Sequence, residues 1–298
     1  MLTILHGSDL HFGRPFDEAV ARVFRETIRG ISPDLLVLSG DFTQRAKVRE
    51  YRLAREFLDS LPDVPTVVTP GNHDVPLYRV WERVFAPLRN YRQFLSEELD
   101  TVTRVEGAVV VSLNSTAPLR AVVNGHLTDP QLLFAAEALK DARPTDLRVL
   151  VFHHHLAPAP DYESDQVLKG YQRCIRAFEK MKVDLILGGH LHRSFTANTQ
   201  DVIPGKRKDG GIVIAHSGTT TSTRGRARER NKNTLNLIGI SREWMEITHH
   251  LYVDGANGFV PMASHAFPRR GGALPGRAGT VAGHPADDDA VGAEERGE

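Results

Sequence analysis

The chain has 298 residues, with 37 basic and 37 acidic side chains and therefore a formal net charge of zero. This length excludes a miniature fold that depends on disulfides or zinc, and the charge balance excludes an overall electrostatic attraction to nucleic acid or membranes. The single cysteine, Cys174, excludes an intrachain disulfide. No apolar run approaches the roughly 20 residues that cross a bilayer, and the N-terminal segment lacks the basic start of a secretory signal. We therefore expect a cytoplasmic protein without a transmembrane segment.

The first part of the chain alternates between short apolar runs and amphipathic helical patterns. Residues 2–5 are apolar, residues 16–31 have helical spacing, and residues 35–41 form a second apolar run. A helix is expected from about 48 to 61, and a further apolar run with a polar loop occupies 66–74. This order predicts an α/β domain whose buried, mainly parallel strands end in loops at one edge.

The middle of the chain is less regular. Residues 77–99 have helical spacing, with aromatic side chains that face a core or cover the site as a cap. Plain packing is the favoured interpretation. The further elements expected are a strand at 109–116, a helix at 129–142, a strand at 147–152, a helix at about 165–181 and a strand at 183–192.

The last third contains apolar runs without helical patterns between them. Antiparallel strands are expected at 194–199, 211–216, 234–240 and 244–253. After about Phe267 the sequence is rich in glycine, proline and alanine and poor in large apolar groups, so burial cannot offset the entropy of ordering it. We expect one domain over 1–265 and a disordered tail over 266–298.

Polar side chains follow five of the predicted strands. They are Asp9, His11, Asp41, Asn72, His73, Asp74, the histidines at 153–155, His190 and His192. Loops at the ends of parallel strands meet at one edge of a sheet, so these residues can converge. Aspartate, histidine and asparagine without thiolates are ligands for divalent manganese, iron, zinc or nickel. One such histidine would more often be a capping or surface residue, but five loops together favour a metal site.

The motifs in these loops have a recognisable order. DLH stands at 9–11, GD at 40–41, GNHD at 71–74, a histidine directly follows a strand, and GHLH stands at 189–192. In order, spacing and context they resemble the calcineurin-like metallophosphoesterases, from residue 1 to about 260. The resemblance implies a four-layer α/β/β/α sandwich with two mixed β-sheets and a metal-dependent phosphoric ester hydrolase.

The resemblance also implies two divalent metal ions held by seven residues. One ion would be held by Asp9, His11 and His192, the other by Asn72, His153 and His190, and both by a bridging Asp41. Residues i and i+2 of an extended segment point the same way, so Asp9 with His11, and His190 with His192, are expected to act as pairs.

The three successive histidines leave open which of them is the metal ligand. The position directly after the strand favours His153, and His154 is the alternative ligand. His155 is expected to line the pocket or to orient a neighbouring side chain.

The implied mechanism is in-line attack on phosphorus by a metal-bridging hydroxide, without a covalent enzyme intermediate. His73, next to a candidate ligand, is placed to protonate the leaving oxygen, and Asp74 to orient the His73 ring. A turn or capping role for Asp74 is an equally good alternative.

Three further segments bear on the substrate. SLNST at 112–116, NGHLTDPQLLFAAEAL at 124–139 and GGIVIAHSGTTTS at 210–222 resemble the branch of bacterial class III cyclic nucleotide phosphodiesterases and glycerophosphodiesterases. We expect hydrolysis of small phosphodiesters, with 3′,5′-cyclic nucleotides as candidates. A nuclease of the repair phosphoesterase type and a non-catalytic phosphoesterase-fold binding protein are the alternatives, and the intact His73 argues against the second.

Basic residues gather between 204 and 232, where eight of them stand against Asp209 and Glu229. Such a segment can attract nucleic acid or an anionic lipid surface. Solvated loops are the favoured interpretation, because aromatic residues for base stacking are absent. Separately, Arg45 stands near where a substrate phosphate could reach. The sequence predicts neither the oligomeric state nor the identity of the metals.

Overall fold

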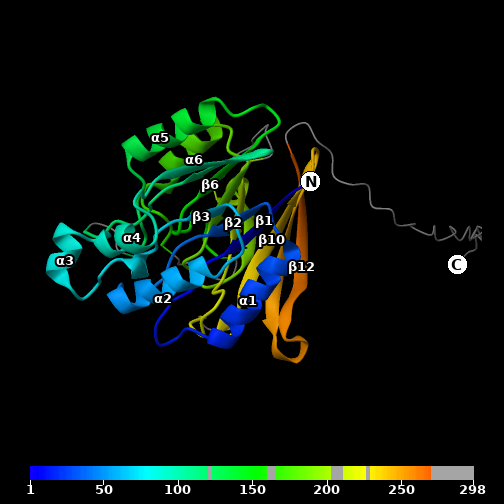
Figure 1. The fold of residues 1–298 in the computed structure, drawn as a ribbon. Coiled ribbons are helices and arrows are strands. Elements are labelled where there is room, and N and C mark those ends of the chain that lie inside the picture. The colour runs from blue at the N-terminus through cyan, green and yellow to red at the C-terminus, as the bar shows by residue number, and fades with distance from the viewer. Residues whose placement is uncertain (120–122, 160–165, 203–210, 226–228, 270–298) are drawn as a thin grey trace, which may run out of the picture.

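Two mixed six-stranded sheets form the centre of the molecule (Figure 1). The computed structural model describes residues 1–119, 123–159, 166–202, 211–225 and 229–269. The first sheet has the order β12 (Gly258–Pro268), β11 (Trp244–Val253), β10 (Thr234–Ile240), β1 (Leu2–Gly7), β2 (Leu35–Leu38) and β3 (Thr66–Val68). The second has the order β4 (Thr101–Val105), β5 (Ala108–Ser112), β6 (Leu147–Val151), β7 (Leu185–Gly188), β9 (Val213–His216) and β8 (Phe195–Asn198).

The central strands are rich in apolar residues on both faces because both faces are covered. In β1 and β2, Ile4, Leu35 and Val37 face the other sheet and join one buried cluster with its residues. The alternate residues Leu5 and Leu36 belong to a different cluster, shared with the helices. Since successive side chains of a strand point to opposite faces, two-sided burial produces the continuous apolar runs seen in the sequence.

Helices cover the outer face of each sheet. The first sheet is covered by α1 (Glu18–Ile31), α2 (Val48–Asp59) and α4 (Arg89–Phe94), and the second by α5 (Asp129–Lys140) and α6 (Tyr171–Lys180). Figure 1 shows the two groups of helices on opposite sides of the sheets. The short helices α3 (Val80–Phe85) and α7 (Thr199–Val202) complete the set described. The predicted four-layer α/β/β/α sandwich with two mixed sheets is confirmed.

Strand direction brings the polar loops together. β1, β2 and β3 are parallel, and so are β5, β6, β7 and β9. β10 and β11 are antiparallel as predicted, whereas β9 pairs antiparallel with β8 but parallel with β7. The carboxyl ends of the parallel strands of both sheets therefore open toward the same edge of the molecule.

The segment 77–99 is not one helix but two short ones, α3 and α4. Pro87 lies between them, and a proline is excluded from a helix interior because it lacks an N–H and clashes with the preceding turn. The aromatic side chains divide accordingly. Tyr91 of α4 is fully buried, but Trp81 and Phe85 of α3 are exposed over 78% and 74% of their surface. The packing interpretation thus holds for α4 and is wrong for α3.

Two strands and the start of one helix also differ from the sequence-based expectation. The edge strands β4 and β12 were not predicted, and β12 runs to Pro268, beyond the domain boundary expected at residue 265. The helix expected from about 165 begins at Tyr171. The tail from residue 270 onward and parts of the basic segment, 203–210 and 226–228, lie outside the described residues. Among the described helices, none combines the length and the apolar character needed to cross a membrane.

Candidate functional site

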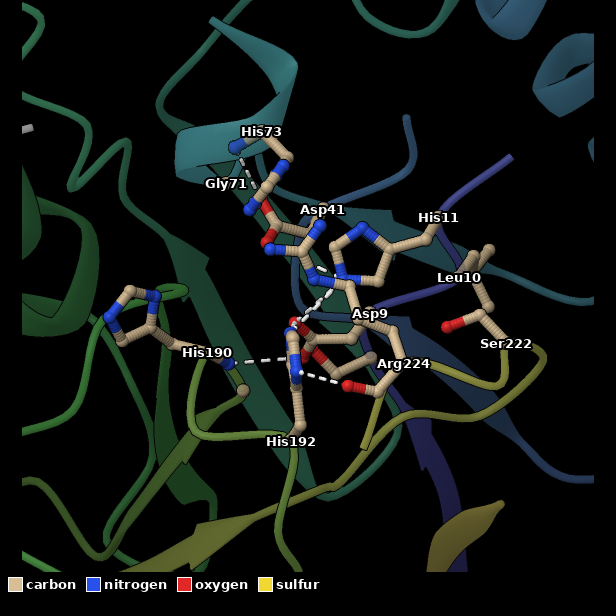
Figure 2. A network of polar contacts seen from close by, with 12 residues as sticks. Asp9, Leu10, His11, Asp41, Gly71, His73, His190, His192, Ser222 and Arg224 are labelled. Carbon is tan, nitrogen blue, oxygen red and sulfur yellow. Dashed lines mark hydrogen bonds and ion pairs between the residues drawn. The ribbon is translucent and has the colours of Figure 1, made fainter. Parts of the chain in front are cut away.

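The seven candidate ligands lie together at the edge where the parallel strands of both sheets end. Asp9 and His11 follow β1, Asp41 follows β2 and Asn72 follows β3, all in the first sheet. The other three, His153, His190 and His192, follow β6 and β7 of the second sheet. Figure 2 shows Asp9, Asp41 and His11, from the first sheet, facing His192, from the second, across the seam between the two sheets.

The first group consists of Asp9, His11, Asp41 and His192. One ligand atom from each lies within 4.8 Å of the others, and all four residues are buried. The Nε2 atoms of His11 and His192 are 3.1 Å apart, and Asp9 Oδ1 is 3.5 Å and 3.1 Å from them. Nitrogen and carboxylate oxygen atoms so arranged are suited to a divalent metal ion.

The second group consists of Asn72, His153 and His190. Asn72 Oδ1 lies 2.8 Å from His190 Nδ1 and 3.2 Å from His153 Nε2. The two ring nitrogens are 3.3 Å from each other. These three side chains therefore also direct their ligand atoms to a common place, as expected from the sequence.

Asp41 lies between the two groups. Its Oδ2 atom is 3.8 Å from His11 Nε2 and 3.3 Å from His153 Nε2. The other oxygen, Oδ1, accepts a hydrogen bond of 2.7 Å from the backbone N–H of His73.

Asp9 uses its two oxygens in the same way as Asp41, because its Oδ2 accepts a hydrogen bond of 3.0 Å from the backbone N–H of His190. Asp9 Oδ1 and Asp41 Oδ2 are buried and accept no hydrogen bond in the described part of the chain. Buried carboxylate oxygens that accept no hydrogen bond are suited to a bound cation.

Hydrogen bonds on the outer side of two histidines fix which nitrogen faces inward. His153 Nδ1 donates to the Ser39 carbonyl at 2.8 Å, and His192 Nδ1 donates to the Arg224 carbonyl at 3.2 Å. In the neutral ring this leaves the Nε2 lone pair of each directed at the other candidate ligands. His153 Nε2 then faces the acceptor oxygens of Asn72 and Asp41, an approach that only a proton or a metal ion makes favourable.

The electrostatics of the cluster also favour a bound cation. Burial lowers the pKa of His11 to about 4, so its ring is neutral near pH 7, the form that binds metal. Burial raises the pKa of the Asp41 carboxyl, but the neighbouring His153 and His73 outweigh this and leave the pKa well below its ordinary value. Burial lowers the pKa of His153, but Asp41 outweighs it and raises the pKa to about 9. The ionised carboxylate thus attracts positive charge to its inner oxygen.

The backbone at the site has an uncommon conformation. Asp9, His11, Asp41, His190 and His192 all have φ between 51° and 75°, in the left-handed region. They are five of the ten non-glycine residues with positive φ in the described chain. Such backbone costs free energy and persists where the surroundings enforce it. The structure brings Asp9 and His11 into one group of candidate ligands but places His190 and His192 in different groups. All four residues stand in left-handed turns rather than in the extended strand ends that were expected.

Two motif glycines let neighbouring backbone approach the candidate ligands. Gly40 has a φ of +98°, and a Cβ there would stand 2.5 Å from His153 Nδ1. A Cβ on Gly71 would stand 2.1 Å from Asp41 Oδ1. Any side chain at either position would displace a candidate ligand.

His73 lies beside the cluster, with its ring 5.0 Å from that of His11 in an edge-to-face arrangement. Its Nδ1 donates to the Gln44 carbonyl at 2.9 Å. Asp74 is not its orienting partner. The Asp74 carboxylate instead accepts from the backbone N–H groups of Gly71, Phe42 and Thr43 and from the Thr43 hydroxyl, at 2.9–3.2 Å. Asp74 therefore ties the second and third motif loops together, and the carbonyl of Gln44 orients the His73 ring.

The neighbouring histidines of the triple run are also buried. His154 Nδ1 pairs with the Ser115 hydroxyl at 2.8 Å, and its ring centre is 4.8 Å from that of His190. His155 stacks on His190 with ring centres 5.4 Å apart. Both therefore pack around a candidate ligand.

The backbone carbonyls of Ser39 and Arg224 each hold a candidate ligand, and the carbonyl of Gln44 holds His73. These three contacts were not predicted. A carbonyl group is present in every residue, so no side-chain pattern reveals it. Ser115 was part of a quoted motif without a role, and its spacing from the histidine run carries no signal of contact.

The segment that contains all seven candidate ligands matches the model of a known protein family. Residues 2–194 match the calcineurin-like phosphoesterase family. The chain belongs to that family. Members of this family of metal-dependent phosphoesterases use two divalent metal ions, and the buried aspartate and histidine cluster of this member is suited to bind metal.

Three curated relatives of this calcineurin-like phosphoesterase are named as phosphodiesterases, and two others as pyrophosphatases. A probable cyclic nucleotide phosphodiesterase of Synechococcus is 29% identical over 167 residues, which are 55% of this chain and 60% of that protein. A probable glycerophosphodiester phosphodiesterase of Arcobacter nitrofigilis is 29% identical over 176 residues, 57% of this chain and 61% of that protein. The matches thus span about three fifths of each relative's length.

The fold is shared with a more distant protein. The structure of a purple acid phosphatase from yellow lupin superimposes with a TM-score of 0.69 and 13% identity, over 90% of this chain and 54% of that one. At this identity the likeness concerns the fold alone.

Proposed function

We propose that this chain is a phosphodiesterase that hydrolyses small phosphodiesters with two divalent metal ions. The position of Asp41 Oδ2 carries the proposal. This buried oxygen accepts no hydrogen bond in the described chain and lies between two groups of candidate ligand atoms, 3.8 Å from one histidine nitrogen and 3.3 Å from another. One carboxylate between two such groups is the arrangement expected of a shared ligand. When bound, two divalent ions lower the pKa of a water molecule and neutralise charge on the phosphoryl oxygens.

The two groups would hold one ion each. Asp9, His11 and His192 would hold the first, and Asn72, His153 and His190 the second, with Asp41 shared. His153 is favoured over His154 because its Nε2 is directed at Asp41 and Asn72, whereas His154 Nδ1 is engaged by Ser115. The oxygen and nitrogen donors suit manganese, iron, zinc or nickel.

His73 would protonate the leaving oxygen. The Gln44 carbonyl accepts from Nδ1 and holds the ring beside the cluster, so Nε2 is the nitrogen left to act on a substrate. When the ring carries a second proton, that proton is on Nε2 and can be donated to the departing alkoxide. Asp74 acts indirectly, by fixing the backbone on either side of Asp41 and His73.

Small phosphodiesters are the substrate class that the relatives support, and 3′,5′-cyclic nucleotides are the leading candidates. Two of the curated relatives carry the names of a probable cyclic nucleotide phosphodiesterase and a probable glycerophosphodiester phosphodiesterase. The reaction would then release a phosphomonoester and an alcohol group, which in a cyclic nucleotide remain on one product.

The test is a comparison of substrates with and without metal. With manganese, we expect the purified chain to hydrolyse bis(p-nitrophenyl) phosphate and a 3′,5′-cyclic nucleotide. Dialysis against a chelator should abolish both activities, and added manganese should restore them. Faster turnover of single-stranded DNA than of either small diester would favour a nuclease. Metal binding without turnover of any of these diesters would favour a binding protein.

A further inference from the structure

A pocket rich in basic side chains adjoins the candidate metal site. It has a volume of about 530 Å³, and we call it the basic pocket. Its lining includes Arg14, Gln44, Arg45, Lys47, Glu50 and Arg224. None of these residues is a candidate metal ligand, so this concentration of charge needs another explanation.

The wall of the basic pocket is bonded directly to two site histidines. The Gln44 carbonyl accepts from His73 Nδ1, and the Arg224 carbonyl accepts from His192 Nδ1. Figure 2 shows the second contact, with Arg224 beside His192. A substrate whose scissile phosphate lies among His73, His192 and the metals would therefore have the basic pocket next to it.

The cations come from three separate segments of the chain. Arg14 follows the first motif after β1, Arg45 and Lys47 follow Asp41 ahead of α2, and Arg224 precedes β10. Convergence from three segments distinguishes this pocket from a run of solvated charges on one helix or loop. Arg224 also belongs to the basic segment at 204–232, so at least one member of that segment faces the site region.

The charges in the basic pocket do not cancel. Glu50 is the only carboxylate among the described lining residues, and it is engaged with the backbone N–H groups of Arg45 and Lys47 at 2.8 Å and 3.3 Å. The Arg45 guanidinium lies 5.4 Å from the centre of the Tyr78 ring, which limits its orientation by a cation–π contact. Even without Arg224, three cations (Arg14, Arg45 and Lys47) stand against one engaged carboxylate in a chain of zero net charge, and they form a local site for an anion.

We propose that the basic pocket binds a second phosphate group of the substrate. Among small phosphodiesters, cyclic nucleotides included, one that carries an additional phosphate is then a better substrate than the same diester without it. This inference rests on the proposed phosphodiesterase function, because it places the scissile phosphate at the metal site. Guanidinium and ammonium groups donate charge-assisted hydrogen bonds to phosphate oxygens, which makes phosphate the anion that best fits.

A matched pair of chromogenic esters tests the proposal. The p-nitrophenyl ester of thymidine 5′-phosphate is compared with the same compound bearing a 3′-phosphate, and release of p-nitrophenolate is measured with manganese present. We expect kcat/KM to be about ten- to a hundredfold higher for the 3′-phosphorylated ester. In Arg14→Gln/Arg45→Gln the ratio of the two values should fall to about one. The control Arg176→Gln/Arg242→Gln removes two exposed arginines that do not line the pocket and should keep the wild-type ratio.

A binding measurement separates this inference from the proposed function. Calorimetry of the manganese-loaded chain compares thymidine 3′,5′-bisphosphate with thymidine 5′-phosphate, and we expect the bisphosphate to bind about tenfold tighter in the wild type but not in the Arg14/Arg45 variant. Equal affinities and equal kcat/KM values in the wild type would overturn the pocket while leaving the phosphodiesterase intact. A binding preference without hydrolysis of either ester would support the pocket and refute the function. Affinity that keeps rising with oligonucleotide length would overturn the assignment to a small substrate.

Discussion

Asp9 and Asp41 use their two carboxylate oxygens differently. In each, one oxygen accepts a hydrogen bond from a backbone N–H in the loop of another motif. The other oxygen is buried, accepts no hydrogen bond in the described chain and is turned toward the histidines. The backbone contact fixes the carboxylate, and the remaining oxygen is available to a metal ion. The motifs in the sequence predicted that these two residues lie among the candidate ligands. Their left-handed backbone was not predicted, because aspartate is enriched in that conformation but adopts it too rarely for the sequence to predict it.

His73 offers the sharpest test at the scale of one residue. We expect His73→Ala to keep both metal ions but to slow hydrolysis of a diester with a poor alkoxide leaving group by ~10²- to 10⁴-fold. The loss should be much smaller for p-nitrophenolate, which departs with little protonation. Steady-state kinetics on both substrates, together with metal analysis, make the measurement.

A surface histidine supplies the control for this comparison. His265 is exposed on β12, and His265→Ala should leave both rates unchanged. If His73→Ala slowed both substrates equally at unchanged metal content, the role of general acid would have to be abandoned for one in phosphate binding.

The short helices α3 and α4 show how far periodicity alone can predict an element. The aromatic spacing of 77–99 is helical throughout, yet Pro87 divides the segment, and only the second helix packs on the core. A proline in the sequence predicts the break. Which of the two halves meets the core depends on the path of the chain afterward, which spacing cannot reveal.

Exposure predicts opposite outcomes for two aromatic substitutions in these helices. Tyr91 is fully buried against Phe42, so Tyr91→Ala should reduce the free energy of unfolding by about 3–5 kcal/mol. Trp81 is 78% exposed and stacks only on Phe85 among the ring contacts described. Trp81→Ala should therefore change the free energy of unfolding by less than about 0.5 kcal/mol. Urea unfolding of both variants measures the difference. Similar losses in the two would mean that α3 packs more closely than described.

The edge strand β12 was missed for an identifiable reason. Among the described strands it pairs with β11 alone. It is largely exposed and contains Pro261 opposite His250, next to a register shift. Prolines and irregular pairing are tolerated at a sheet edge because one side of the strand needs no partner. The sequence of β12 therefore lacks the alternation of apolar and polar residues that marks a half-buried strand. The buried strands, with two covered faces, gave far stronger patterns.

At the scale of the whole molecule, the site lies on the seam between the two sheets. Asp9, His11, Asp41 and Asn72 follow strands of one sheet, and His153, His190 and His192 follow strands of the other. The rule that parallel strands end at one edge predicts this convergence from element order alone. The basic pocket was not predictable in the same way. Its cations come from three loops whose sequences show no shared motif, and only the folded chain brings them together.

The most direct test of the two-metal account is to count metal ions in a variant of Asp41. After equilibration with manganese, the wild type should hold two ions per chain. Asp41→Asn should hold fewer and lose phosphodiesterase activity in parallel, because the neutral amide cannot replace a shared carboxylate. Asp59→Asn, which alters an exposed carboxylate paired with Arg55 on α2, should behave like the wild type. Two tightly bound ions in Asp41→Asn, with full activity, would contradict the account.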